Sequence, residues 1–138
     1  MKVDHFYELE VYKVAFDLQQ AIFDESKNWP KLEDYSLTDQ IRRSSRSIGA
    51  NISEAWAKRR YSAHFVSKLT DADGELQETH HWLSTAAECG YLSNVAVADL
   101  IAKAESVGRQ LGSMIKKYQS FSLSLLHRQT ASPPNRFT

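Results

Sequence analysis

The sequence of 138 residues has little cysteine, proline or glycine: one, three and five residues respectively. The single cysteine, Cys89, cannot form a disulfide within the chain, and we find no apolar signal segment, so we expect a reducing cytoplasm. No uncharged stretch is long and apolar enough to span a bilayer, so we expect no membrane partner. Because helix breakers are this scarce, and two of the prolines lie close to the C-terminus, long helices are predicted.

An excess of charge of one sign is also lacking, because 17 basic residues balance 17 acidic ones. This balance argues against a protein that coats nucleic acid non-specifically. The distribution is uneven, however. Residues 1–34 carry eight acids against four lysines, residues 42–60 carry six bases against Glu54, and residues 71–88 carry five acids and no lysine or arginine. This pattern fits either packing between oppositely charged segments or subunits, or a local patch that binds anions.

Four segments place apolar residues at helical spacing, at about residues 6–26, 37–58, 62–89 and 94–121. The third alternates steps of four and three without a break, through Phe65, Leu69, Ala72, Leu76, Thr79, Leu83 and Ala86. The fourth repeats this alternation through Ile101, Ala104, Gly108, Leu111, Ile115 and Tyr118, with Leu100, Val107, Met114 and Phe121 alongside. Such heptads are typical of helices that pack at shallow angles. We therefore predict one all-α domain over residues 1–124, an antiparallel up-down-up-down four-helix bundle, and a flexible tail over residues 125–138.

Local signals predict how the helices end and approach one another. Trp29-Pro30 should end the first helix, because the residue before a proline is pushed out of the α region. Gly90 should form a left-handed cap on the third helix, and Ser93 or Asn94 should cap the fourth. Gly49, inside the second helix, predicts a bend or a close contact with another helix.

The first helix carries a second apolar row in addition to its core stripe. Its members are Phe6, Leu9, Phe16 and Phe23. Further large rings occur elsewhere, at Tyr7, Tyr12, Tyr35, Trp56 and Tyr61. A bundle of this size needs one core stripe for each helix, so the surplus favours a subunit interface. Burial of the first helix over a wide arc is the alternative.

No catalytic or metal site can be assembled from the sequence. A di-iron site in a bundle needs two Glu-x-x-His motifs, and Glu78 with His81 forms the single example. The heptad of the third helix turns both side chains away from the core, so we interpret them as part of a solvated acidic face. No nucleophile elbow or glycine-rich phosphate loop is present. We therefore predict no enzyme activity, no catalytic residue, no metal or other cofactor, and no small-molecule substrate.

The basic segment at residues 37–60 is the strongest candidate for a functional surface. At 100° per residue, Arg42, Arg46 and Arg60 lie on one flank of the second helix. Arginines in such a stripe can bind phosphates through two hydrogen bonds each. Lys58 and Arg59 extend the charge, although the helix dipole alone also favours cations at a C-terminus. Arg43 and Glu54 lie on the side far from the core, where a pairing within or between subunits is a structural alternative.

This segment resembles the bacterial four-helix-bundle proteins first found as reading frames in 23S ribosomal RNA intervening sequences. The resemblance begins with the LTDQIRR run of residues 37–43, followed by Ser47-Ile48 and by the NISE run of residues 51–54. Supporting matches in the same order extend it over about residues 6–118. The chain departs from the family pattern at Gly49, where proline is usual, and at Ala55, where glycine is usual. Ala55 removes a flexible break, so the second helix should run further before it turns.

The resemblance implies a left-handed bundle that assembles as a ring-shaped homopentamer, with no enzymatic activity. It also implies similarity to the accessory variability proteins of diversity-generating retroelements, which bind nucleic acid and a reverse transcriptase. The matching positions in this chain are Gln40, Arg43, Asn51, Glu54 and Arg59 or Arg60.

Taken together, these observations predict a non-enzymatic, homo-oligomeric module of the cytoplasm that binds structured RNA or a nucleoprotein, or acts as a scaffold. The nucleic-acid contacts are predicted at Arg42, Arg46, Lys58, Arg59 and Arg60. The signature or interface residues are predicted at Gln40, Arg43, Asn51 and Glu54. A protein–protein adaptor without nucleic-acid binding is the alternative.

Overall fold

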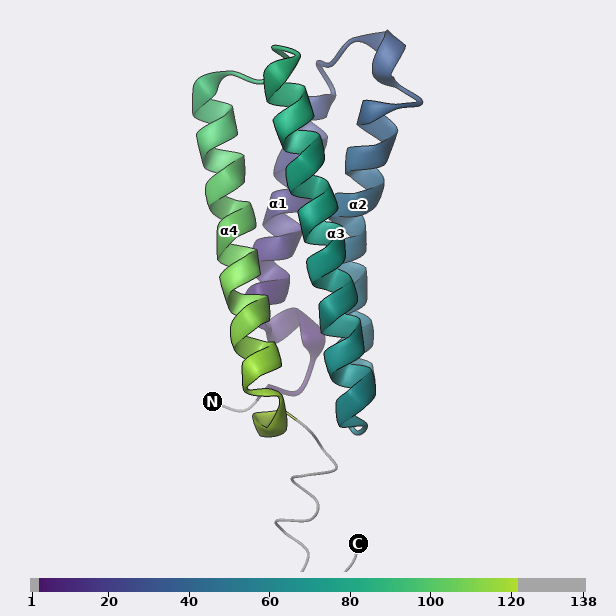
Figure 1. The fold of residues 1–138 in the computed structure, drawn as a ribbon, viewed down its shortest axis with the longest axis vertical. Helices are drawn as coiled ribbons and strands as arrows, with labels where there is room; N and C mark the ends of the chain where they lie inside the picture. The colour runs from purple at the N-terminus through teal and green to yellow at the C-terminus, as the bar shows by residue number, and fades with distance from the viewer. Residues whose placement is uncertain (1–2, 122–138) are drawn as a thin grey trace, which may run out of the picture.

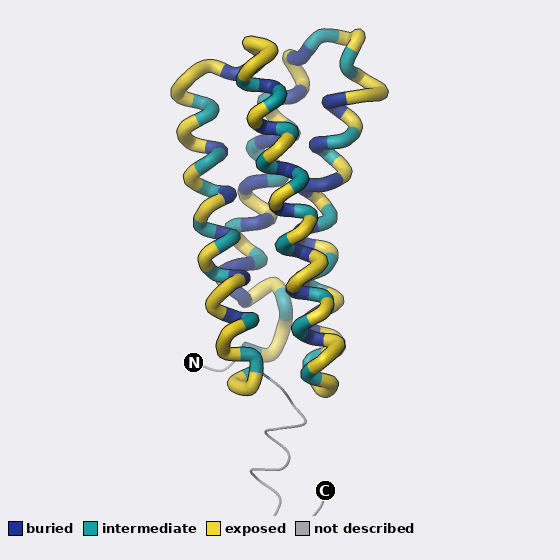
Figure 2. The backbone as a smooth tube through the Cα atoms, in the orientation of Figure 1, coloured by how far each residue is buried: buried dark blue, intermediate teal, exposed yellow. Residues whose placement is uncertain are grey.

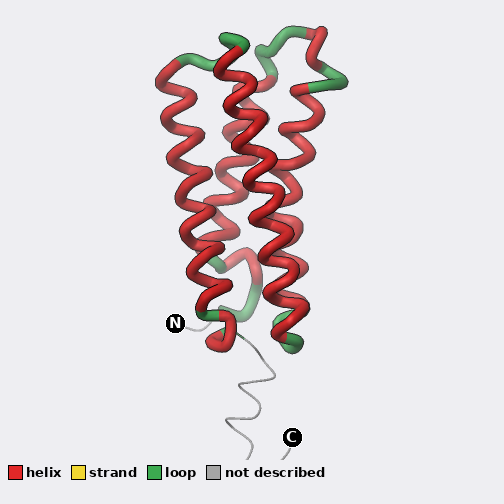
Figure 3. Tube along the Cα trace, viewed as in Figure 1, coloured by secondary structure: helices red, strands yellow, loops and turns green. Residues whose placement is uncertain are grey.

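The computed structural model describes residues 3–121, and every regular element in that range is helical (Figures 1 and 3). Its four long helices are α1 (Glu10–Ser26), α2 (Leu37–Ala57), α3 (Ser62–Glu88) and α4 (Asn94–Lys116). Its three short 3₁₀ helices are η1 (Phe6–Glu8), η2 (Lys31–Glu33) and η3 (Tyr118–Ser120). The prediction of an all-helical fold built on four long helices, with no strand in residues 3–121, is confirmed. The predicted tail at residues 125–138 lies outside the described part of the chain.

The four long helices lie side by side, and each packs against two neighbours (Figure 1). The contacts join α1 with α2, α2 with α3, α3 with α4, and α4 with α1. The α1–α2 and α3–α4 connections lie at one end of the molecule, and the α2–α3 turn lies at the other (Figure 1). Both faces of α2 that flank its buried stripe are therefore bordered by another helix, α1 on one side and α3 on the other.

The buried residues form a continuous inner stripe along the four helices (Figure 2). On α3 the buried set is the predicted one, from Phe65 to Ala86. On α4 the buried residues are Leu100, Ala104, Val107, Leu111 and Met114, which combine Ala104 and Leu111 of the predicted row with three of the residues predicted alongside it. Two apolar rows run side by side on this helix, and the row containing Ile101 and Ile115 is only partly buried. Gly108, in that outer row, leaves room for Leu76 from α3, whose Cδ2 lies 3.3 Å from an ideal Cβ position.

Two predicted helix ends are corrected by the structure. The first helix does not run unbroken from Phe6, because Leu9 is extended (φ −68°, ψ 131°) and separates η1 from α1. The Glu8 carboxylate accepts hydrogen bonds from the backbone N–H groups of Asp4 and His5, at 2.9 and 3.0 Å. These bonds stabilise the short turn, and Leu9 is buried in the core. The fourth helix ends at Lys116 instead of residue 121, and η3 follows it.

The predicted glycine and cap signals are confirmed. Gly90 adopts φ +78° after α3, and the Tyr91 N–H donates to the Ala86 carbonyl at 2.9 Å, which closes the helix end. Ser93 Oγ accepts from the Ala96 N–H at 3.1 Å at the start of α4. Gly49 marks a close contact of α2 with α1, because a Cβ there would lie 3.3 Å from Tyr12 Cε1.

The second apolar row that was predicted for the first helix, and the further large rings, divide between the core and the surface. Leu9 and Trp56 are buried, so neither is free to form a subunit interface as predicted. Other rings of the predicted set remain accessible: Tyr35 is 97% exposed, Tyr61 60% and Phe16 45%. An interface therefore remains a prediction for this reduced set of side chains.

Residues 3–121 were also compared with the requirements of a membrane-spanning helix and of a metal site. None of its helices combines the length and the apolar character needed to cross a membrane. No group of three or more His, Cys, Asp or Glu residues is placed to hold a metal ion in this range. His81 is exposed, and the Glu78 carboxylate is directed to Arg43 and Trp82, so this Glu-x-x-His pair faces outward as predicted.

Candidate nucleic-acid interface

The candidate site is built on α2, whose buried stripe fixes the direction of all its other side chains. Ile41, Ile48 and Ile52 are fully buried in the core. A buried polar contact adds to this stripe, because the hydroxyl groups of Ser44 and Thr79 lie 2.9 Å apart and form a hydrogen bond between α2 and α3. The rotation of α2 about its axis is therefore fixed, and its arginines point in defined directions.

Arg42 and Arg46 lie on the flank of α2 that borders α1, one helical turn apart. Their guanidinium carbons are 4.8 and 5.5 Å from the centre of the Phe23 ring, which α1 contributes. These distances are in the range of cation–π contacts. Arg42 Nε also donates to Ser26 Oγ at 2.9 Å. The nearest described partners of both arginines are therefore an aromatic ring and a hydroxyl group, which leave the positive charge unneutralised.

A third cation joins them, because Lys27 Nζ lies 4.7 Å from the centre of the same ring. We call Phe23, Lys27, Arg42 and Arg46 the Phe23 cluster. In residues 3–121 the only carboxylate within 4.0 Å of any of its three cations is Asp24, at 3.5 Å from Lys27. The cluster thus brings three positive charges to one ring with a single close counter-charge. Such an arrangement attracts an anion with several acceptor oxygens, such as phosphate.

The contribution of α1 to this cluster was missed at the sequence level. Phe23 and Lys27 are spaced i and i+4, so they lie on one face of α1. That spacing was available as a signal, but only the tertiary packing shows that this face meets Arg42 and Arg46.

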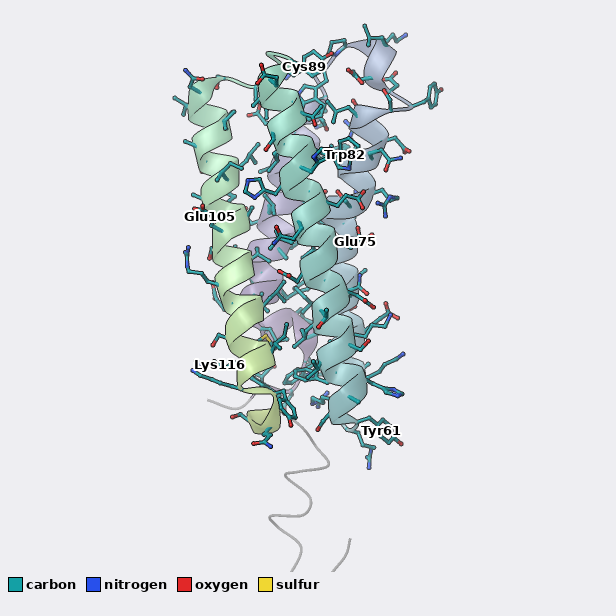
Figure 4. The ribbon with its side chains drawn as sticks, viewed as in Figure 1. Tyr61, Glu75, Trp82, Cys89, Glu105 and Lys116 are labelled. Carbon is teal, nitrogen blue, oxygen red and sulfur yellow. The ribbon has the colours of Figure 1, made fainter. Side chains whose placement is uncertain are left out.

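The flank of α2 that borders α3 is neutralised. Arg43 Nη2 donates to Glu78 Oε2, and Arg43 Nη1 lies 3.6 Å from Glu75 Oε1. Trp82 Nε1 donates to the same Glu78 oxygen at 3.1 Å, and Figure 4 shows Glu75 and Trp82 along α3 on the side of α2. The hydrogen bond from Trp82, and then that from Arg43, hold the pKa of Glu78 below its usual value. The bond to Glu78 raises the pKa of Arg43.

These contacts test one of the alternatives that the sequence leaves open for Arg43, a pairing with Glu54 within the chain. An Arg43–Glu54 pairing within the chain is wrong, because Glu54 pairs with Lys68 at a distance of 3.6 Å. Both residues are instead bound to α3. Packing between the basic segment of α2 and the acidic segment of α3 is therefore confirmed for this flank.

The cations at the end of α2 are separated from the Phe23 cluster. Arg46 and Lys58 are twelve residues apart, which corresponds to about 18 Å along a helix. Arg59 is packed over the Trp56 ring at 4.2 Å and donates from Nη1 to the Trp56 carbonyl at 2.7 Å. Burial lowers the pKa of Arg59. Lys58 and Arg60 are exposed. The predicted nucleic-acid residues thus form two groups instead of one stripe.

The remaining signature residues have local contacts. Asn51 Nδ2 donates to the Ser47 carbonyl at 2.9 Å, one turn earlier in α2. Gln40 is partly buried near the start of the helix, where its N–H donates to the Ser36 carbonyl at 2.9 Å. Neither side chain lies in the Phe23 cluster.

Comparisons with known proteins identify a family and a similar solved structure. The model of the family described as 23S rRNA-intervening sequence protein matches residues 7–113. A crystal structure of a protein of unknown function from the S23 ribosomal protein family of Bacteroides thetaiotaomicron is similar, with a TM-score of 0.69 and 28% sequence identity. The similarity covers 77% of this chain and 98% of that one. The search of curated proteins gives no match.

Proposed function

We propose that this chain, which belongs to the 23S rRNA-intervening sequence protein family, is a non-enzymatic cytoplasmic module that binds structured RNA or a nucleoprotein. In the proposal, left-handed up-down-up-down bundles assemble into a homopentameric ring. The Phe23 cluster contacts the phosphate backbone, and the ring repeats this contact in each copy. The family name refers to ribosomal RNA by the position of a gene, so the support for an RNA contact comes from the residues of the Phe23 cluster.

The Phe23 cluster is the observation that carries the proposal. It brings Lys27, Arg42 and Arg46 to one ring, and Asp24 alone among the described carboxylates lies within 4.0 Å of them. The planar guanidinium groups match the geometry of phosphate oxygens. Neutral net charge is no obstacle, because the attraction depends on the local field and not on the sum over the chain.

Accessible apolar side chains support the assembly part of the proposal. In the α1–α2 connection, Leu32 is 79% exposed and Tyr35 is 97% exposed. On α1, Phe16 forms a stacked ring pair with Tyr12 at 6.1 Å and is itself accessible. Large exposed apolar groups of this kind are enriched at protein interfaces. Ring closure would repeat a modest basic patch and increase its avidity without any new contact.

Binding to structured RNA at low and moderate salt tests the nucleic-acid part. The R42Q/R46Q variant removes two charges of the cluster, and we expect its affinity to fall at least tenfold. R109Q is the matched control, because Arg109 is an exposed arginine on α4 with no described ion pair. Equal affinities of wild type, R42Q/R46Q and R109Q, or binding that does not depend on salt, would contradict the proposal.

Native mass spectrometry tests the assembly independently of RNA. We expect a mass of five chains for the wild type. The F16D/Y35D variant should reduce that mass, because charged groups would replace two accessible rings. A monomeric wild-type protein at micromolar concentration would contradict the ring.

A protein–protein adaptor without nucleic-acid binding is the second candidate. The exposure of Leu32 and Tyr35, in the α1–α2 connection, is the observation that favours it. In that case the wild type would form the oligomer, whereas its RNA affinity would be absent at all salt concentrations.

A further inference from the structure

The corner between α2 and α3 contains a hollow that is separate from the Phe23 cluster. It is lined by Lys58, His64, Ser67 and Lys68 and has a volume of about 230 Å³. Figure 4 shows Tyr61 at this end of α3, with nitrogen-tipped side chains projecting beside it. Pockets for drug-sized ligands have volumes of about 300–1,000 Å³. The hollow therefore fits a small group better than a large ligand.

The lining of this corner hollow has a uniform chemistry. Each of its four side chains can donate a hydrogen bond, and none of them is a carboxylate. Two are ammonium groups, one is an imidazole and one is a hydroxyl. The ammonium groups only donate hydrogen bonds, and the imidazole and the hydroxyl can donate as well as accept, so the lining fits a compact, multiply charged oxyanion.

The charges near the hollow leave an excess of cations. Lys68 lies 3.6 Å from Glu54 and 3.8 Å from Asp71, so those two carboxylates offset its charge. Lys58 and Arg60 have no carboxylate within 4.0 Å in the described residues 3–121. The C-terminal end of α2 and the N-terminal end of α3 meet here, so their dipoles largely offset each other. The side chains therefore determine the sign of the local potential, which is positive.

We propose that the corner hollow binds a terminal phosphate monoester of RNA. A backbone diester offers two free oxygens and one negative charge, whereas a monoester carries about −1.5 to −2 charges and three acceptor oxygens. A lining of four side chains that can donate hydrogen bonds matches the monoester better. The identity of the ligand as RNA rests on the proposed function. The claim that the hollow binds a phosphate group does not rest on the proposed function, because free inorganic phosphate presents the same group.

The corner hollow can be tested separately from the Phe23 cluster. The two sites share no residue, and Lys58 is about 18 Å from Arg46 along α2. Removing Lys58 and His64 should therefore leave the Phe23 cluster intact. Both side chains are exposed, so their replacement should not unfold the protein.

The experiment compares three RNA oligonucleotides of one sequence, with a 5′-phosphate, with a 3′-phosphate, and with hydroxyl groups at both ends. We expect the wild type to bind one of the phosphorylated RNAs about tenfold more tightly than the hydroxyl form, which corresponds to about 1.4 kcal/mol. The K58Q/H64A variant should lose this preference and bind all three RNAs with equal affinity. K116Q/H81A is the matched control, since it removes one exposed lysine and one exposed histidine elsewhere and should behave like the wild type.

Titration with inorganic phosphate, followed by calorimetry, is the second measurement. We expect saturable binding by the wild type and the control, and at least a tenfold loss in K58Q/H64A. Equal binding of all three RNAs by the wild type together with no phosphate binding would overturn the inference. If phosphate binds but no RNA does, the hollow stands and the proposed RNA function fails. If RNA binds through Arg42 and Arg46 without any preference for a phosphorylated end, the proposed RNA function stands and the inference about a terminal phosphate fails.

Discussion

Arg42 and Arg43 are neighbours in the sequence, yet they lie on different flanks of α2 in different electrostatic surroundings. Arg43 is bound to Glu78 and lies close to Glu75, so α3 neutralises its charge. Arg42 borders α1, where it contacts the Phe23 ring and the Ser26 hydroxyl. Three cations share that ring with one close carboxylate. The counter-charges on the helix that an arginine packs against therefore decide whether its charge is neutralised within the chain.

The two flanks also differ in what their arginines contribute to the fold. Arg43 joins a network that includes Trp82 and links α2 to α3. The Phe23 cluster places like charges close together, which costs stability unless a ring or an anion offsets the repulsion. We therefore expect the α3 flank to matter for stability and the α1 flank to matter for binding. The following predictions test this division, beginning with the largest effect.

The comparison depends on the rigid core that holds both flanks in place. Ile48 is fully buried at the centre of α2. Replacing it in I48A should destabilise the protein by about 2–5 kcal/mol, because the substitution removes buried methyl groups and leaves a cavity. Urea unfolding followed by circular dichroism measures the change. RNA affinity of the folded fraction should stay within twofold, and a large loss at low denaturant would mean that the core also shapes the binding flank.

A single arginine on each flank gives a direct comparison for binding. R46Q should lower the slope of log affinity against log salt concentration by about 0.7–0.9, the value for one lost phosphate contact. R43Q should leave the slope unchanged, because its guanidinium group is already occupied by Glu78. Fluorescence anisotropy over a series of salt concentrations measures both. Equal slopes for the two variants would remove the distinction between the flanks.

The same two variants should show the opposite order in stability. R43Q should lower the free energy of unfolding by about 0.5–1 kcal/mol, the upper range for partly exposed ion pairs. R46Q should change it by less than about 0.5 kcal/mol, because Arg46 is exposed and has no described carboxylate partner. The unfolding midpoints in urea provide the measurement. A larger loss in R46Q than in R43Q would show that the Phe23 cluster is structural.

The smallest expected effect is a pH dependence that belongs to the α3 flank alone. The pKa of Glu78 is lowered in the folded protein by Trp82 and Arg43. Its contribution to stability is therefore present above the usual carboxyl pKa of about 4.3 and is lost as the pH falls through the lower folded value. The difference in stability between wild type and R43Q should persist at neutral pH and shrink as the pH falls below the usual carboxyl pKa. The difference between wild type and R46Q should not change over this range.

The sequence predicts the core of this protein better than it predicts the candidate site. The buried residues of α3 follow from the alternation of Phe65 to Ala86, because only one face of that helix is apolar. On α4 two apolar rows compete, and periodicity cannot decide which one faces inward. The break at Leu9 also escapes the pattern, because the Glu8 carboxylate stabilises a turn inside a run that looks helical.

For the candidate site, the sequence predicts that Arg42 and Arg46 share a flank, since helical geometry determines it. It does not predict that Phe23 and Lys27 join them, because those residues belong to another helix. Of the residues that line the corner hollow, only Lys58 is among the predicted nucleic-acid residues, whereas His64, Ser67 and Lys68 come from the following helix.

The sequence by itself determined where helices form, which face of each is apolar, and where glycine ends or crowds them, because these depend on residues a few positions apart. The tertiary structure alone decided which partners the arginines of α2 meet on the neighbouring helices. Arg43 meets Glu78 from 35 positions away in the chain, and Arg42 meets Ser26 from 16 positions away. Such partners depend on how each helix is rotated against its neighbours, and that rotation is fixed by the packing of the whole core.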